Sequence, residues 1–182
     1  MYHEVTGSGA IGYLATKPVM IITTLHETGI VNAGVFGAYT NMSAEHVGVA
    51  CHTSSHTLAN IRRSGEFVIN VPGADLVKSL AIIASDIPPS ESEIDAAGLS
   101  CRDGVVVQTS SIAQCQAAVE LKFTQEVTAA SHVFVIGTVV GGWIKSAVLD
   151  EDGAIDIFKA RVIKDFKYPK PLYIVPGDVI QG

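Results

Sequence analysis

The stretch that most constrains this chain covers residues 32–60, where a strand pattern passes directly into a helix pattern. Within it, residues 46–52 alternate between two faces with the period of a β-strand. One face carries the bulky side chains, Val47, Val49 and Cys51. The other face has only Gly48 and Ala50 in its interior, so a planar molecule could approach the backbone there. The same small residues could instead fill the crowded interior of a small barrel.

A run of small polar residues follows this strand and leads into the helix pattern. Its members are His52, Thr53, Ser54, Ser55, His56 and Thr57. Leu58 and Ile61, spaced i, i+3, mark the start of an amphipathic helix. Because the first N–H groups of a helix have no partner within the helix, they and the hydroxyls suit a phosphate dianion. An ordinary helix cap at Ser55 explains the same residues, and this alternative stays open.

Further strand patterns are spread along the chain and outnumber the helix patterns. Apolar, β-branched runs predict strands at 18–25, 66–71, 117–127 and 133–144. A turn at 26–29 returns the first of these to a hairpin partner at 30–33. Helix patterns are confined to 55–64, which Gly65 ends, and 74–84. Many strands, few helices and no regular β-α-β alternation predict a mainly β fold, an antiparallel barrel with peripheral α-helices.

The length of 182 residues predicts a single domain over residues 1–182 with a sizeable core. Residues 85–105 change character, because they contain two adjacent prolines and several acidic residues, Glu91, Glu93 and Asp95. We interpret them as a surface excursion and not as a domain boundary, since strand patterning resumes immediately. The proline-containing residues at the end of the chain predict an extended tail.

The segment Gly7–Gly12 matches the dinucleotide-binding pattern G-x-G-x-x-G. That pattern binds a dinucleotide only between a buried parallel strand and a helix. Here the preceding residues are few and polar, and Pro18 would end any helix within about two turns. The sequence therefore does not predict a Rossmann site.

Composition excludes several classes of protein. The formal net charge of -6 argues against non-specific nucleic-acid binding. No apolar stretch is long enough to cross a bilayer, and the first residues do not resemble a signal peptide. The three cysteines, Cys51, Cys101 and Cys115, are odd in number and widely spaced, which predicts free thiols and a cytoplasmic location. Only 16% of the residues are charged, which indicates apolar surface hidden in an oligomer.

Three residues at the strand-to-helix junction are of the types that bind zinc, namely Cys51, His52 and His56. No fourth ligand is evident, and their spacing crosses the junction. We therefore treat a metal site as the weakest of the functional hypotheses and predict none.

Several segments together resemble the flavin reductase-like, flavoredoxin-type FMN-binding split-barrel family. They follow the family's order along nearly the whole chain, at Pro18–Thr24, Asn32 with Phe36, Tyr39–Ser43, Thr57–Ile61, Ser64–Val71, Ile94–Leu99, Ala118–Lys122 and His132–Val139. Each segment alone is a weak signal, but their order and spacing make the resemblance specific. It implies a Greek-key split barrel that forms a homodimer and holds a flavin near the subunit interface, with FMN as the expected cofactor and FAD as the alternative that the sequence leaves open.

The resemblance also implies roles for individual residues. Those expected along the flavin ring are Asn32, Phe36, Ala38, Tyr39, Thr40, Asn41 and Ser43, and those expected at the phosphate are His52, Thr53, Ser54, Ser55 and Thr57. His132 is the expected catalytic residue, facing the ring, and Phe166 is expected to cover the flavin from the tail. Relatives often carry a basic residue in the excursion, where Glu91 and Glu93 stand here. Neutralisation of the phosphate is therefore left to the remaining basic candidates, Arg62, Arg63 or Lys78.

Two functions follow from this resemblance. The first is an oxidoreductase that reduces FMN with NAD(P)H, the flavin itself accepting the hydride. The second is a flavodoxin-like electron carrier that holds FMN permanently, has no nicotinamide site and serves a redox-protein partner. Both functions need the same cradle, so the sequence does not separate them.

Overall fold

The structure is a computed structural model that describes residues 16–166 and 170–180, together with Glu4 and Leu14. The glycine motif Gly7–Gly12 lies outside the described residues. Of the described helices, none is both long enough and apolar enough to cross a membrane.

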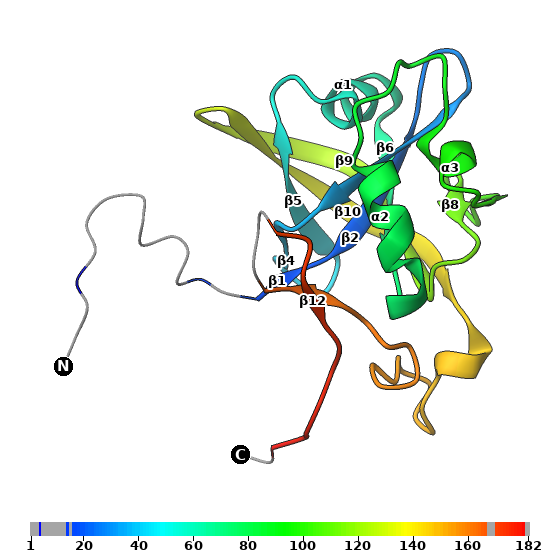
Figure 1. Cartoon of the computed structure of the whole chain (residues 1–182). Coiled ribbons are helices and arrows are strands. Elements are labelled where there is room, and N and C mark those ends of the chain that lie inside the picture. Colours follow the sequence, from blue (N-terminus) through cyan, green and yellow to red (C-terminus); the bar gives the residue numbers. More distant parts are fainter. Residues whose placement is uncertain (1–3, 5–13, 15, 167–169, 181–182) are drawn as a thin grey trace.

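One antiparallel sheet of seven strands dominates the molecule (Figure 1). In spatial order its strands are β3 (Val31–Phe36), β2 (Met20–Leu25), β6 (Glu66–Val71), β9 (Ala117–Ala129), β10 (His132–Ile144), β5 (His46–His52) and β4 (Tyr39–Asn41). The sheet curls into a half-barrel and few helices accompany it, which confirms the predicted mainly β split-barrel fold.

Shorter elements surround this sheet. They are α1 (His56–Ser64), α2 (Val77–Ile83) after a 3-10 turn at Ala74–Leu76, α3 (Glu93–Ala96), the pair β7 (Cys101–Arg102) and β8 (Ser111–Ile112), and a 3-10 turn at Ser146–Val148. A small sheet joins β1 (Lys17–Pro18), β11 (Lys164–Asp165) and β12 (Tyr173–Ile174). The tail was predicted to be only extended, but its segment at β12 is thus hydrogen-bonded.

Helix α1 begins and ends where the sequence predicts. The Ser55 hydroxyl accepts a hydrogen bond from the Leu58 N–H, which is the geometry of a helix N-cap. At the other end Gly65 adopts a left-handed φ of 72° and donates its N–H to the Ile61 carbonyl. This helix thereby holds the polar run of residues 52–57 at one end of the half-barrel (Figure 1).

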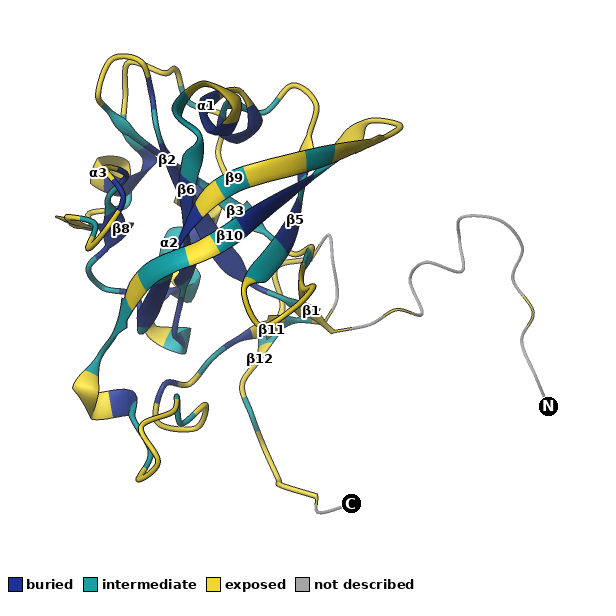
Figure 2. Ribbon diagram, turned by 180° about the vertical axis from the view of Figure 1, so that it is seen from behind, coloured by how far each residue is buried: buried dark blue, intermediate teal, exposed yellow. Residues whose placement is uncertain are grey.

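The core lies on both faces of the sheet (Figure 2). Inside the half-barrel Phe67 and Leu121 pack with Leu58 of α1. On the outer face Ile21 packs with Leu80 of α2 and Ile94 of α3. Because β2 contributes to both sides, its apolar run has no polar alternation, as expected for a strand buried on both faces.

The excursion after α2 is fastened to the sheet by buried polar side chains. Glu120 of β9 is fully buried, and its carboxylate accepts the backbone N–H groups of Val105, Val106 and Val107 at 2.6–3.1 Å. Asn70 accepts the Ile112 N–H at 2.8 Å. The interpretation of residues 85–105 as a surface excursion was wrong for α3, whose Glu93 is only 4% exposed.

Candidate functional site

A pocket of about 380 Å³ lies between β3, the loop after β5 and the segment 83–87 that follows α2. Six of the predicted cofactor-binding residues line it, namely Asn32, Phe36, His52, Ser54, Ser55 and Thr57. They come from strand β3 and from residues 52–57, two regions brought together by the packing of α1 against β2 and β3. The volume is in the usual range of small-molecule sites.

Asn32 is the residue with the clearest unused hydrogen-bonding capacity. It is 3% exposed and lines the pocket. Its amide nitrogen donates to the hydroxyls of Thr24 and Thr57, at 3.1 and 3.2 Å. Within the described part of the chain its amide oxygen accepts no hydrogen bond. This oxygen is open to the pocket, since no fully buried side-chain atom of the described chain lacks a partner, and it can accept a hydrogen bond from a ligand that carries a donor.

The adjacent backbone leaves little room for larger residues. A Cβ atom at Gly34 would lie 3.0 Å from the Phe36 ring and 3.5 Å from the Thr57 hydroxyl. A larger residue at position 34 would therefore require the Phe36 ring to shift by a few tenths of an ångström.

The hydroxyls of the polar run are not equivalent. Ser55 is engaged twice, because it caps α1 and donates to the His52 carbonyl at 2.8 Å. Ser54 bonds to Nδ1 of His52 at 2.8 Å. Thr57 accepts from Asn32, and among the described residues its own proton has no acceptor. Thr53 does not line the pocket, and its N–H donates to the Ser131 carbonyl instead.

Two histidine pairs flank the pocket. His52 lines it, and across the β5–β10 pairing the ring of His132 lies 5.3 Å away in an edge-to-face arrangement. His132 therefore lies next to the pocket wall, where its Nδ1 bonds to Ser131 at 3.1 Å. The second pair is His56 and His26, with ring centres 5.4 Å apart. Burial lowers the pKa of His26, whose Nδ1 accepts from the Asn60 amide at 3.1 Å.

Among the pocket residues that were not predicted as site residues, three are titratable, namely His56, Asp86 and Glu93. The Glu93 carboxylate reaches the exposed edge of β3 and accepts the Ala33 N–H at 3.0 Å. No local pattern identifies it, because an acidic residue between prolines and polar residues is typical of surface. The only available signal was the Ser92 N-cap, which places Glu93 in the first turn of a helix.

Other predicted site residues lie elsewhere in the structure. Ala38, Tyr39, Thr40, Asn41 and Ser43 lie at or next to β4, the sheet edge opposite β3 in strand order, and do not line the pocket. Phe166 is 40% exposed and follows β11, which pairs with β1. The Ser43 hydroxyl is occupied by Nδ1 of His46 and by two backbone N–H groups. Their contacts with the flavin therefore stay predictions.

The small-residue face of β5 is covered by a side chain of the neighbouring strand. A Cβ atom at Gly48 would overlap the ring of Phe134 on the neighbouring strand β10. The planar group that approaches this backbone is therefore a side chain of the protein, as in the barrel-filling alternative. At the same strand, burial raises the pKa of the Cys51 thiol to about 12, which disfavours it as a zinc ligand at neutral pH. Within the described residues no cluster of His, Cys, Asp and Glu has the arrangement of a metal site.

The basic residues left as candidates for the phosphate do not line the pocket. Arg62 forms a two-point ion pair with the Glu126 carboxylate, at 2.7 and 3.0 Å. Arg63 donates to the Leu25 carbonyl. Lys78 is an exposed residue of α2.

Comparisons with known proteins agree with this fold. The model of the family described as "Flavin reductase like domain" matches residues 13–171. An uncharacterized protein of Methanothermobacter thermautotrophicus is 30% identical over 172 residues, which are 91% of this chain and 77% of that protein.

Solved structures share the architecture at low sequence identity. The flavoredoxin of Desulfovibrio vulgaris (Miyazaki F) superimposes with a TM-score of 0.88 at 18% identity, covering 100% of this chain and 97% of that one. The FMN-binding protein of Thermus thermophilus with bound 1-cyclohex-2-enone gives a TM-score of 0.80 at 18% identity, covering 100% and 98%. These structures share the fold, and the family match over residues 13–171 shows that this chain belongs to the flavin reductase-like domain family.

Proposed function

We propose that this protein binds FMN in the pocket beside β3 and that NAD(P)H reduces the bound flavin. The observation that carries the proposal is the Asn32 side chain in the pocket wall, whose amide oxygen accepts no hydrogen bond within the described chain and is open to the pocket. The ring edge of a flavin carries an N–H group that matches this acceptor. A relative whose structure is described as an FMN-binding protein supports the same cofactor.

The described residues fit the two ends of FMN. Asn32 would bind the ring edge, and Phe36 would supply an apolar surface near it. Thr57 and Ser54 would donate hydroxyl protons to the phosphate, assisted by the first N–H groups of α1. When bound, the flavin supplies the hydride-accepting chemistry. His132, next to the wall residue His52, would orient the nicotinamide or transfer a proton.

The experiment that tests this function separates an enzyme from an electron carrier. The protein is loaded with FMN, and NADH or NADPH is added anaerobically while the flavin absorbance is followed. Loss of the oxidised flavin absorbance supports the reductase. A protein that binds FMN but keeps its absorbance would be a carrier that depends on a redox partner. Failure to bind FMN would contradict both functions.

We further propose that the protein forms a homodimer. Apolar side chains are exposed along the tail, where Ile174, Val175 and Val179 are 40%, 43% and 72% exposed. They lie at an apolar groove of about 450 Å³ that also contains Ile157 and Phe158. Exposed apolar surface of this kind is typical of subunit contacts. Light scattering at micromolar concentration tests the proposal, and a monomer mass would contradict it.

A further inference from the structure

One carboxylate in the wall of the pocket is almost fully buried. Glu93, the first residue of α3, is 4% exposed and lines the pocket. Its Oε2 accepts the Ala33 N–H at 3.0 Å, which joins α3 to the edge of β3. None of the described residues that line the pocket is a lysine or arginine, and within the described chain Glu93 forms no ion pair. This carboxylate therefore relies on a single N–H donor from the described chain.

The second oxygen of this carboxylate is open to the pocket. Within the described chain, Oε1 of Glu93 accepts no hydrogen bond. No fully buried side-chain atom of that part of the chain lacks a partner, so Oε1 keeps access to the pocket and its solvent. The fully buried Glu120 differs, because both of its oxygens accept backbone N–H groups. An ionised carboxylate only accepts hydrogen bonds, so Oε1 suits a ligand group that donates one.

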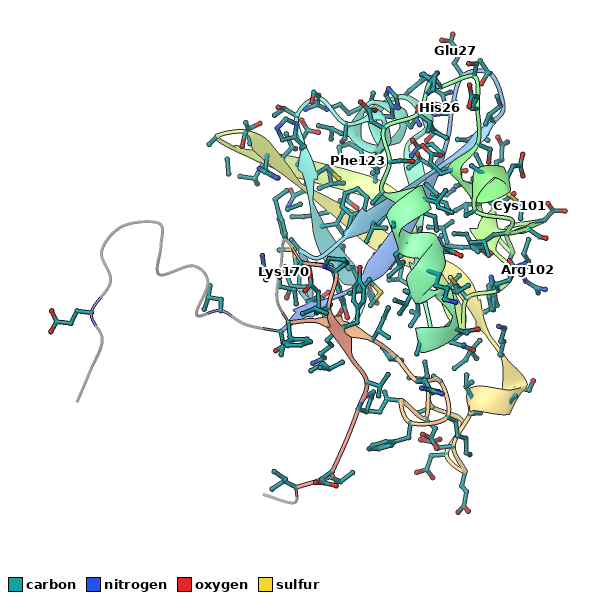
Figure 3. All side chains as sticks on the ribbon, in the orientation of Figure 1. His26, Glu27, Cys101, Arg102, Phe123 and Lys170 are labelled. Carbon is teal, nitrogen blue, oxygen red and sulfur yellow. The ribbon has the colours of Figure 1, made fainter. Side chains whose placement is uncertain are left out.

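A second open acceptor lies beside Glu93 on the same wall. Asn32, the residue before Ala33 on β3, has an amide oxygen that is open to the pocket. Figure 3 shows His26 at the end of the molecule where α1 lies. Burial and then His56 lower the pKa of His26, and the Glu93 carboxylate partly opposes this shift, so Glu93 acts at the same end. Two acceptors at neighbouring positions of β3 therefore meet one ligand site.

The hydrogen-bond donors of FMN occupy different parts of the molecule. The oxidised ring carries one N–H group, which the proposed function assigns to Asn32. The phosphate is largely dianionic at neutral pH, since its second pKa is about 6, and a carboxylate would repel it. The remaining donors are the hydroxyls of the polyol chain between the ring and the phosphate. A carboxylate oxygen in this wall therefore matches the polyol chain.

We propose that Oε1 of Glu93 accepts a hydrogen bond from a hydroxyl of the polyol chain, so that Glu93 selects flavins that carry this chain. The inference deepens the proposed function and rests on it for the identity of the ring. Glu93 then makes two separate contacts, one to β3 through Oε2 and one to the ligand through Oε1. Only the second contact depends on which flavin is bound.

The test compares riboflavin with lumiflavin, which has the same ring but a methyl group in place of the polyol chain. Neither flavin carries a phosphate, so contacts with the phosphate do not enter the comparison. Fluorescence titration of the full chain at neutral pH measures both dissociation constants. We expect riboflavin to bind at least about tenfold more tightly than lumiflavin, which is the scale of a hydrogen bond to a charged group.

Variants of the full chain assign this preference to Glu93. Glu93→Gln removes the charge and keeps an oxygen for the Ala33 N–H. It should bind riboflavin about five- to tenfold more weakly than the wild type does, because hydrogen bonds to charged groups are stronger than neutral ones. Its affinity for lumiflavin should not change. Glu91→Gln is the matched control, because Glu91 is exposed and does not line the pocket, and it should keep both wild-type affinities.

Three results would overturn the proposal. The first is an equal affinity of the wild type for riboflavin and lumiflavin, which can be measured even if Glu93→Gln fails to fold. The second is an unchanged affinity of Glu93→Gln for riboflavin. The third is an equal loss for both flavins in this variant, which would mean that Glu93 acts only by holding β3. In all three cases the protein still binds flavin. Absence of binding by riboflavin, lumiflavin and FMN would instead overturn the proposed function, and this inference with it.

Discussion

Two clusters of polar side chains use their hydrogen-bonding groups differently. The anchor cluster consists of the buried residues Asn70 and Glu120, and it holds residues 105–112 against the sheet. Asn70 donates to Ile21 and Thr23 and accepts from Ile112, so both ends of its amide are engaged. Both oxygens of Glu120 likewise accept backbone N–H groups. The anchor cluster is therefore complete without any further molecule.

The pocket cluster consists of Asn32, His56 and Thr57, and it is incomplete by the same measure. The Asn32 oxygen, the His56 ring nitrogens and the Thr57 hydroxyl proton have no partner among the described residues. No fully buried side-chain atom of the described chain lacks a partner, so these groups face the pocket and its solvent, where a ligand would meet them. The comparison predicts that changes in the anchor cluster affect stability and that changes in the pocket cluster affect ligand binding.

The largest effect is expected from Glu120→Ala in the anchor cluster. The substitution removes three hydrogen bonds to a charged acceptor, each worth about 1.5–3 kcal/mol, and it leaves the N–H group of the buried residue Val107 without its acceptor. We expect the free energy of unfolding to fall by at least about 3 kcal/mol, measured by denaturant titration. Glu126→Ala is the control, because that exposed carboxylate pairs only with Arg62 and should leave the midpoint unchanged. Equal losses in the two variants would refute the division into clusters.

Thr57→Ala in the pocket cluster should weaken FMN binding by roughly 1.5–3 kcal/mol, the scale of a hydrogen bond to a charged group. This equals a loss of about 10- to 150-fold in the dissociation constant. Riboflavin, which lacks the phosphate, should bind nearly as before, and fluorescence titration measures both. A similar loss for the two flavins would mean that Thr57 acts through its bond to Asn32 and not on the phosphate.

Local patterns predicted the elements of this fold but not the contacts between distant ones. The strand at 66–71 and the cap at Ser55 depend on neighbours in the sequence, and both are present in the structure, although the four central residues of β6 are all buried and do not alternate. Glu93 was misplaced because its burial depends on the edge of β3, sixty residues away in the chain. Gly48 presents a bare backbone in the sequence, but the ring that covers it belongs to β10.

The site was predictable to the extent that it is built from contiguous residues. Residues 52–57 and β3 were both identified, and the structure brings six of their predicted members to one pocket. The residues at β4 were grouped with them through the resemblance, yet strand order places β4 and β3 at opposite edges of the sheet. A half-barrel can bring its two edges near one ligand only through curvature or a second subunit, and neither follows from periodicity.

His132→Ala tests whether the pocket continues beyond the described wall. If His132 positions the nicotinamide, the variant should reduce flavin more slowly while its FMN affinity stays within about tenfold, or about 1.4 kcal/mol. Anaerobic stopped-flow measurements give the rate constant directly. Because His132 is exposed, the free energy of unfolding of the variant should differ from that of the wild type by no more than about 0.5 kcal/mol. An unchanged rate constant would remove His132 from the site.

The smallest effect is expected from His26. Its ring contacts His56 of the pocket cluster, but its Nδ1 already accepts a hydrogen bond from Asn60, as the groups of the anchor cluster do with their partners. Its pKa is lowered, first by burial and then by His56, whereas in the unfolded chain it stays near the ordinary 6.5. Below pH 6.5 the unfolded state therefore binds more protons than the folded state, so stability falls as pH falls through this range. More than about one pH unit above 6.5 both states are nearly neutral, and His26 contributes almost no slope.

The variant His26→Asn tests whether His26 affects stability or FMN binding, because the amide of the introduced asparagine can keep a hydrogen bond to Asn60. Denaturant titrations between pH 5 and 8 should show a smaller loss of stability on acidification than in the full wild-type chain. If His26 behaves like the anchor cluster, FMN affinity at pH 8 should be unchanged in the variant, because His26 is neutral there and does not line the pocket. If the variant kept the wild-type dependence of stability on pH but bound FMN more weakly, His26 would belong to the pocket cluster, and the division into two clusters would be wrong.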